Sequence, residues 1–145
     1  MAVYVPLKSS TNYFVAIMRD DRPHVEEMHN RAAPYWAVAM VVCCVVGVST
    51  TKLSLGGFWN AYVLDITGPA WNYVLFRGLA FTYSSNVWTR LFTPTRTIFI
   101  FVIVAFGIES AQWLELYEST FDPWDFVAYI SLLVPMYLID RKIER

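Results

Sequence analysis

Four long apolar runs, separated by more polar stretches, dominate the pattern of hydrophobic and polar positions along the chain. A helix needs about 20 mostly apolar residues to cross the hydrocarbon core of a bilayer. The runs that approach this length are Pro34–Thr50, Pro69–Tyr83, Thr97–Leu116 and Trp124–Ile139. The pattern therefore predicts an all-α protein: a polytopic membrane helix bundle with four transmembrane helices.

An N-terminal segment, residues 1–33, precedes the first run and mixes short apolar and charged stretches. Its apolar stretch, Tyr13–Met18, is too short to span a bilayer and suits a helix lying in the membrane interface. A pair of aspartates before Pro23 is typical of the start of a helix, so we expect a short polar helix over Pro23–Arg31. We therefore divide the chain into a cytoplasmic or interfacial segment, 1–33, and a transmembrane domain, 34–145.

Composition agrees with a membrane location. Hydrophobic residues make up 57% of the 145-residue chain and charged residues 16%, and the mean hydropathy is +0.41. So apolar a composition is unusual for a soluble domain of this size. The net charge is −1 and no basic stripe is interleaved with stacking aromatics, so we expect no nucleic-acid partner.

Basic residues are distributed unevenly among the predicted loops. Lys and Arg collect in cytoplasmic loops of membrane proteins. With four spans, the N-terminal segment, the second loop and the C-terminal tail share one side, and they hold nine of the eleven Lys and Arg residues. We therefore expect both termini to be cytoplasmic. Four tryptophans then fall near the outer interface, where tryptophan is favoured: Trp59, Trp71, Trp113 and Trp124.

Two charged residues, Arg77 and Glu109, fall inside the second and third predicted spans. At about 1.5 Å per residue, both lie roughly 10–12 Å from the outer end of their span. A charge at membrane depth is costly unless it is paired or faces water. The sequence therefore predicts an ion pair between Arg77 and Glu109. A purely structural role for this pair and a functional one both stay open.

Other polar side chains gather near the same outer end. Gln112 follows Glu109 by three residues and so projects from the same helix face. The sequence predicts a polar cluster, of binding or structural role, made up of Asp65, Arg77, Glu109, Gln112, Asp122 and Asp125.

The stretch F-D-P-W-D-F, Phe121–Phe126, opens the fourth span. Asp122 suits the N-cap position, Pro123 the first helical position and Asp125 the third, in a capping box with Asp in place of Glu. Because an Asp side chain reaches back less far than Glu, Asp125 has a second interpretation, in which it faces Asp65, Glu109 and Gln112 across the outer mouth of the bundle.

Four motifs, in this order and spacing, resemble the VanZ-like membrane proteins. They are Y-V-L-D (Tyr62–Asp65), Y-V-L-F-R (Tyr73–Arg77), E-S-A-Q (Glu109–Gln112) and F-D-P-W-D-F-V-A-Y (Phe121–Tyr129). The likeness covers roughly residues 58–139 and is greatest to a sister group of small four-helix proteins of unassigned function. The resemblance implies a polytopic integral membrane protein with a polar cluster, and we expect it in the bacterial cytoplasmic membrane.

Nothing in the sequence favours catalysis. His24 and His29 are five residues apart, unlike the H-E-x-x-H zinc signature. The predicted bundle holds no histidine to activate a nucleophile. We lean against an enzyme and expect no cofactor and no metal, although a site with only carboxylate ligands, Glu109, Asp122 and Asp125, is an alternative.

Two functions remain from the sequence. In the first, the polar cluster binds a lipid head group or a lipid-linked cell-envelope intermediate, with Arg77 contacting an anionic group. In the second, the protein is an accessory subunit of a larger membrane complex that docks through residues 1–33. The docking anchors would then be aromatic residues, a type enriched at interface cores: Tyr4, Tyr13 and Phe14.

Overall fold

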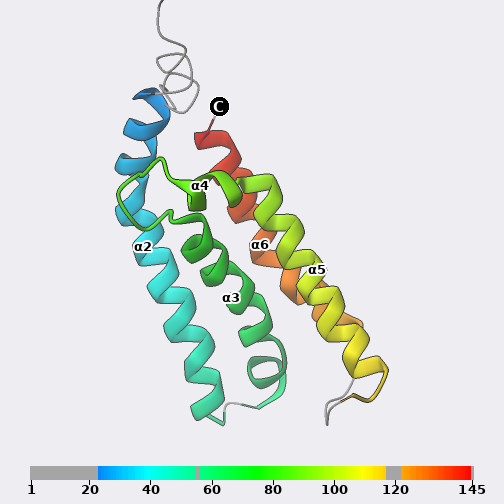
Figure 1. Cartoon of the computed structure of the whole chain (residues 1–145). Coiled ribbons are helices and arrows are strands. Elements are labelled where there is room, and N and C mark those ends of the chain that lie inside the picture. The colour runs from blue at the N-terminus through cyan, green and yellow to red at the C-terminus, as the bar shows by residue number, and fades with distance from the viewer. Residues whose placement is uncertain (1–22, 55, 117–121, 145) are drawn as a thin grey trace, which may run out of the picture.

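The computed structural model describes residues 23–54, 56–116 and 122–144, and these residues form helices and loops with no β-strand. The helices are α2 (Pro23–Lys52), α3 (Gly57–Arg77), α4 (Val87–Leu91), α5 (Pro94–Trp113) and α6 (Trp124–Ile143) (Figure 1). The predicted all-α class is confirmed. The interfacial helix expected at Tyr13–Met18 and the docking anchors Tyr4, Tyr13 and Phe14 lie outside the described residues.

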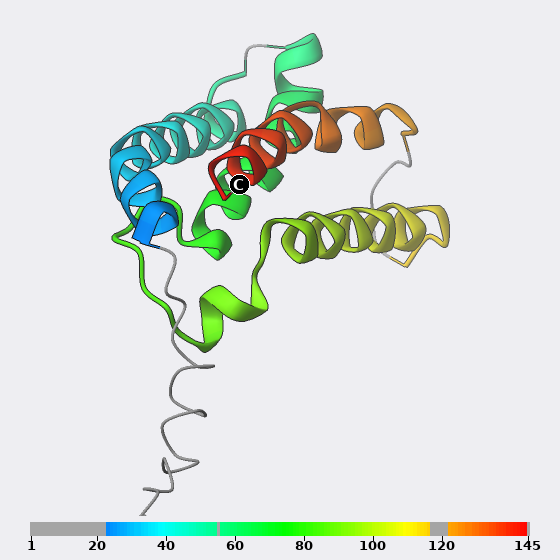
Figure 2. The same ribbon diagram turned by 90° about the horizontal axis from the view of Figure 1, so that it is seen from above.

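The four long helices run alternately up and down the molecule, and the short α4 lies at one end (Figure 1). α3 is central, because it packs against α2 on one side and α6 on another, whereas α5 packs mainly against α6 (Figure 2). We name the two ends after their buried charged residues. The Arg77 end holds the start of α2, the ends of α3 and α6, and the start of α5. The Glu109 end lies opposite (Figure 1).

The second predicted span, Pro69–Tyr83, is wrong at both ends, since α3 begins at Gly57 and ends at Arg77. Gly78 stops the helix in a left-handed conformation (φ 67°), and its N–H and that of the next residue bond back to carbonyls of the last turn. Pro69, which suggested a helix start, lies inside α3. Because proline has no N–H, it removes the helical hydrogen bond to the carbonyl of Asp65.

The other helices also depart from their predicted limits. The short polar helix Pro23–Arg31 and the first span form one continuous helix, α2, of 30 residues, so the boundary between residues 33 and 34 falls inside it. The third helix begins at Pro94 and ends at Trp113, three residues earlier at each end than expected. The fourth begins at Trp124, the first residue of the predicted span and one residue after the predicted first helical position, Pro123, and continues to Ile143.

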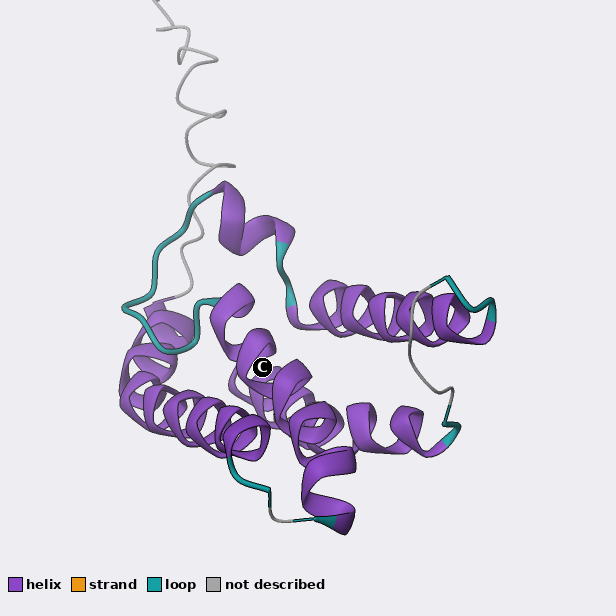
Figure 3. Cartoon of the chain, turned by 90° about the horizontal axis from the view of Figure 1, so that it is seen from below, coloured by secondary structure: helices purple, strands orange, loops and turns teal. Residues whose placement is uncertain are grey.

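The loop between α3 and α4 lies against the first turns of α2 (Figure 3). The Nε2 atom of His29 lies 3.0 Å from the carbonyl oxygen of Phe81, and the backbone N–H of Tyr83 donates to the side-chain oxygen of Asn30 at 2.7 Å. The rings of His29 and Tyr83 meet edge to face. The start of α2 is therefore part of the packed bundle.

The interior is small and partly polar, whereas the outer faces of the helices are apolar. The buried apolar cluster comprises Trp36, Cys43, Ala70, Tyr73, Val74, Leu79, Leu133 and Met136. Buried polar and charged residues are His29, Thr50, Thr67, Arg77, Thr97, Glu109 and Asp140. By contrast, Phe99 and Ile103 on the outer face of α5 are 62% and 68% exposed. Two described helices, α2 and α5, are long and apolar enough to cross a membrane.

α2 and α3 approach closely at Gly47. A Cβ atom at this position would overlap the Oγ1 atom of Thr67, which itself donates to the carbonyl of Val63. We expect Gly47→Ala to lower the free energy of unfolding by about 1–3 kcal/mol, the usual effect of overpacking. Thermal unfolding of the purified protein in detergent measures this loss.

Gly107 on α5 provides the matched control. Nothing lies within 4 Å of a Cβ built there, so Gly107→Ala should be neutral or stabilise by up to about 1 kcal/mol through helix propensity. Adding Thr67→Ala to Gly47→Ala removes the overlapping oxygen and should recover most of the stability. Equal stability of Gly47→Ala and Gly107→Ala would contradict the close packing of α2 on α3.

Candidate functional site

Arg77, the last residue of α3, lies at the opposite end of the bundle from Glu109. Its Nε and Nη2 atoms donate to the two carboxylate oxygens of Asp140 at 2.7 and 3.0 Å. Nη2 also donates to Glu144 at 2.7 Å, and Nη1 donates to the carbonyl of Phe92 at 2.7 Å. The predicted Arg77–Glu109 ion pair is therefore wrong. The prediction places Arg77 in the middle of a span that starts at Pro69. Arg77 is instead the last residue of α3, which starts at Gly57, so it lies at the other end of the bundle.

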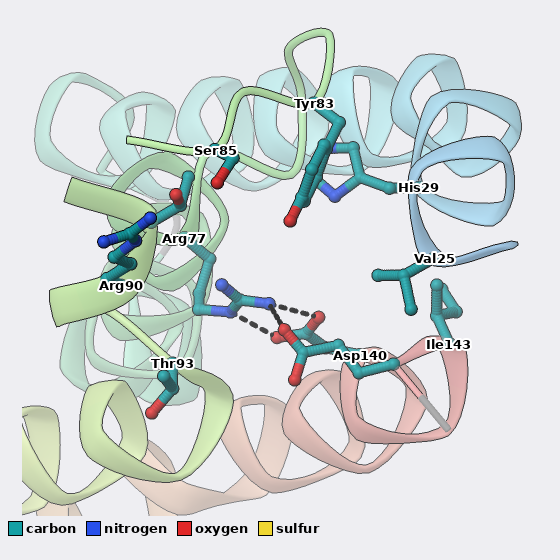
Figure 4. A pocket seen from close by; sticks show the side chains of 11 residues that line it. Val25, His29, Arg77, Tyr83, Ser85, Arg90, Thr93, Asp140 and Ile143 are labelled. Carbon is teal, nitrogen blue, oxygen red and sulfur yellow. Dashed lines mark hydrogen bonds and ion pairs between the residues drawn. The ribbon is translucent and has the colours of Figure 1, made fainter. Parts of the chain in front are cut away.

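The Arg77 network joins three parts of the chain. Arg77 and Asp140 are 5% and 1% exposed, and the hydroxyl of Tyr73 donates to the same carboxylate at 2.6 Å. The pair bridges α3 to α6, and the bond to Phe92 secures the α4–α5 connection. A cavity of about 240 Å³ lies beside it, with Arg77 and Asp140 on one wall (Figure 4). Because these donors of Arg77 are already engaged, we assign it a structural role.

Removing one partner of this pair tests that role. Asp140→Ala would leave a buried guanidinium without its bidentate partner, and we expect a loss of about 3–5 kcal/mol in the free energy of unfolding. Glu144→Ala removes a partner that is 34% exposed, so its expected loss is below about 1 kcal/mol. Denaturant or thermal unfolding in detergent compares the two variants.

An apolar replacement separates a structural role from a functional one. A buried ion pair can often be replaced by apolar residues of similar volume without loss of stability. The triple variant Arg77→Met, Asp140→Leu, Tyr73→Phe also removes the hydroxyl that donates to Asp140, and it should therefore accumulate and unfold near the wild-type temperature. If it folds but loses a ligand that wild type carries, the structural assignment of Arg77 is wrong.

Glu109 and Gln112 lie one turn apart on α5, at the other end of the bundle. Glu109 is 1% exposed, and its Oε1 atom accepts a hydrogen bond from the hydroxyl of Tyr129 at 3.1 Å. Its Oε2 atom and the Oε1 atom of Gln112 are buried and have no hydrogen-bond partner among the described residues. Buried polar atoms are nearly always hydrogen-bonded, so two orphan acceptors this close together need an explanation.

Asp65 and Asp125 bring further negative charge to the same place. Asp65 on α3 experiences the charges of both Asp125 and Glu109, and Asp125 lies near Asp122. The structure therefore brings together five of the six residues predicted to form the cluster and excludes Arg77. α3 and α5 run antiparallel, and Asp65 on α3 lies at the same height as the E-x-x-Q motif, Glu109–Gln112, on α5. These side chains can therefore come together.

Asp122 combines a capping role with a contact that the sequence analysis missed. Its Oδ1 atom accepts from the backbone N–H of Trp124 at 3.0 Å, so its carboxylate caps α6, although the helix begins one residue later than expected. Its Oδ2 atom accepts from the hydroxyl of Tyr62 at 2.6 Å. These two hydrogen bonds hold the pKa of Asp122 below its ordinary value, so this carboxylate stays ionised.

An open cavity of about 390 Å³ lies between α3, α5 and α6 beside this cluster. Its polar lining residues are Asp65, Asn72, Gln112 and Tyr129. The remaining lining is largely apolar and includes Leu64, Phe101, Val104, Ala105 and Ile108. A polar group at one end and hydrocarbon at the other would both find complementary surroundings in such a space.

Tyr62 and Tyr129 are contacts of the site that sequence reasoning missed. Both belong to the quoted motifs, Tyr62 to Y-V-L-D and Tyr129 to F-V-A-Y, which was the available signal. Among the described residues, no three His, Cys, Asp or Glu side chains are placed to hold a metal ion. The alternative of a metal bound by Glu109, Asp122 and Asp125 is thus contradicted.

Comparison of the chain with protein-family models, curated proteins and solved structures finds no match. The VanZ-like resemblance therefore stays a prediction that depends on the motifs alone, and the function has to be argued from the site.

Proposed function

We propose that this chain is a non-catalytic integral membrane protein of VanZ-like type, whose Glu109 end binds the polar head group of a lipid or of a lipid-linked cell-envelope intermediate. One observation supports the binding role above all others. Glu109 is a buried carboxylate with an orphan oxygen, and Gln112, which also has an orphan oxygen, lines a cavity together with Asp65 and a set of apolar side chains. A ligand that donates hydrogen bonds to these oxygens would remove the cost of leaving them unsatisfied.

The distribution of residues supports a membrane location. α2 and α5 expose rows of large apolar side chains, and contiguous apolar surface on this scale marks contact with lipid or with protein. Charged residues inside the bundle, such as Arg77 and Glu109, are buried. α3 and α6 contain no stretch as apolar as those of α2 and α5, and α3 packs between α2 and α6. We propose that all four long helices span the bilayer.

Charge supports one orientation of the bundle. Six of the seven described Lys and Arg residues belong to the Arg77 end: Arg31, Arg77, Arg90, Arg96, Arg141 and Lys142. Positive residues favour the cytoplasmic side, so the Glu109 end should face outward. The bacterial cytoplasmic membrane is the location we propose.

Cysteine labelling tests the orientation. In a background with Cys43→Ala and Cys44→Ala, Ser54→Cys places a thiol in the loop after α2, and Ser85→Cys places one in the loop before α4. Both native serines are exposed. A membrane-impermeant maleimide applied to intact cells should label position 54, and should label position 85 only after permeabilisation. The reverse result would contradict the orientation.

Lipid retention tests the binding role. The tagged protein is extracted from its native membrane in a mild detergent, and bound molecules are identified by mass spectrometry. We expect a defined lipid species whose occupancy falls about tenfold or more in Glu109→Ala, because hydrogen bonds to charged groups contribute about 1.5–3 kcal/mol. Ser110→Ala, the exposed neighbour on the same helix, should retain the lipid.

Two other results would contradict this function. A folded protein that carries no lipid would remove the binding role. A protein partner present in stoichiometric amount, and lost on deletion of residues 1–22, would favour the accessory-subunit hypothesis.

A further inference from the structure

We propose that the group bound at the Glu109 end is a primary ammonium. This inference rests on the proposed function and names the chemistry of its ligand. It replaces the earlier expectation that Arg77 contacts an anionic group there, because Arg77 lies at the opposite end and is bonded to Asp140.

Charge supplies the first argument. Asp65, Glu109 and Asp125 lie close enough to repel one another, and desolvation adds to the cost of their negative charges. No basic side chain of the described residues contributes to the electrostatic interactions of these three carboxylates. Clustered carboxylates in partly buried surroundings favour a cation, and a neutral polyol would leave their repulsion unchanged.

Hydrogen bonding supplies the second argument. When Glu109 is ionised, the two orphan atoms, Oε2 of Glu109 and Oε1 of Gln112, are both acceptors, so a ligand that bonds to them has to donate. An alkylammonium carries three N–H donors, which is enough for both orphan atoms and one further carboxylate. A quaternary ammonium has the charge but no donor. A metal ion would need three convergent ligands, which the described residues do not provide.

The cavity supplies the third argument. Its lining combines polar side chains with apolar ones that include Val104 and Ile108; the polar ones are Asp65, Asn72, Gln112 and Tyr129. An ammonium next to the carboxylates would therefore have its carbon chain on apolar surface. Two sources fit this chemistry: the head group of an aminophospholipid and a free amine such as spermidine.

Head-group variation at constant acyl chains tests the inference. The delipidated protein is reconstituted with phosphatidylethanolamine, phosphatidylcholine or phosphatidylglycerol of identical chains, and bound lipid is counted by native mass spectrometry. We expect ethanolamine lipid to bind about tenfold better than its trimethylated counterpart, because only the primary ammonium can donate to the two acceptors. Spermidine added at millimolar concentration distinguishes the two sources of the ammonium. If spermidine displaces the lipid, or binds while the protein shows no preference among the lipids, the ligand is a free amine.

Matched variants give the control. Glu109→Gln removes one charge at nearly constant volume and should abolish the preference for the primary ammonium. Glu115→Gln makes the same change of charge at an exposed position at the same end and should leave the preference intact. Should Glu109→Gln fail to fold, as judged by its elution profile and unfolding temperature, Asp65→Asn on a different helix tests the same cluster.

The outcomes separate the two proposals. Equal binding of all three lipids that is lost in Glu109→Gln keeps the head-group function and overturns the ammonium. A preference for phosphatidylglycerol also overturns it. Absence of any bound lipid, together with absence of spermidine binding, overturns both the proposed function and this inference.

Discussion

The guanidinium of Arg77 is buried where α3, α6 and the α4–α5 connection meet, and the arrangement of the bundle depends on satisfying it there. Removing a charge from water costs several kcal/mol unless good partners replace the solvent. Asp140 supplies two parallel hydrogen bonds, and Phe92 and Glu144 supply one each. These contacts join segments that lie far apart in the sequence, so one residue fixes how the ends of three helices are placed.

Because Arg77 is bonded to Asp140, it supplies no positive charge to the cluster at the Glu109 end. If Arg77 were paired with Glu109, one carboxylate of the cluster would be neutralised and its orphan oxygen would have a donor. Without it, the cluster retains excess negative charge and two orphan oxygens. The two ends therefore differ in kind. The Arg77 end is a closed network of satisfied groups, whereas the Glu109 end is incomplete in a way that a donating cation would complete.

Much of the helical order could be predicted from the sequence, because apolar runs of this length are a strong signal. The limits of α3 could not, because Pro69 favours a helix start, whereas α3 accommodates this proline in its interior. Gly78 carried the better signal, as a residue suited to the left-handed C-cap. Asp140 lies one residue beyond the fourth predicted span, Trp124–Ile139, so the pattern of apolar runs gives no sign that it is buried beside Arg77.

The cluster itself was predicted more successfully than the pair, and the reason is geometric. Glu109 lies near the end of α5 and Asp125 near the start of α6, whereas Asp65 lies eight residues into α3. Because these helices alternate in direction, all three residues lie toward the Glu109 end and come together. Which groups then bond is decided by side-chain packing. The hydroxyl of Tyr129 reaches Glu109 only because α5 lies against α6, and it occupies one carboxylate oxygen while leaving the other open. That half-satisfied carboxylate is the feature that a functional explanation of this protein has to account for.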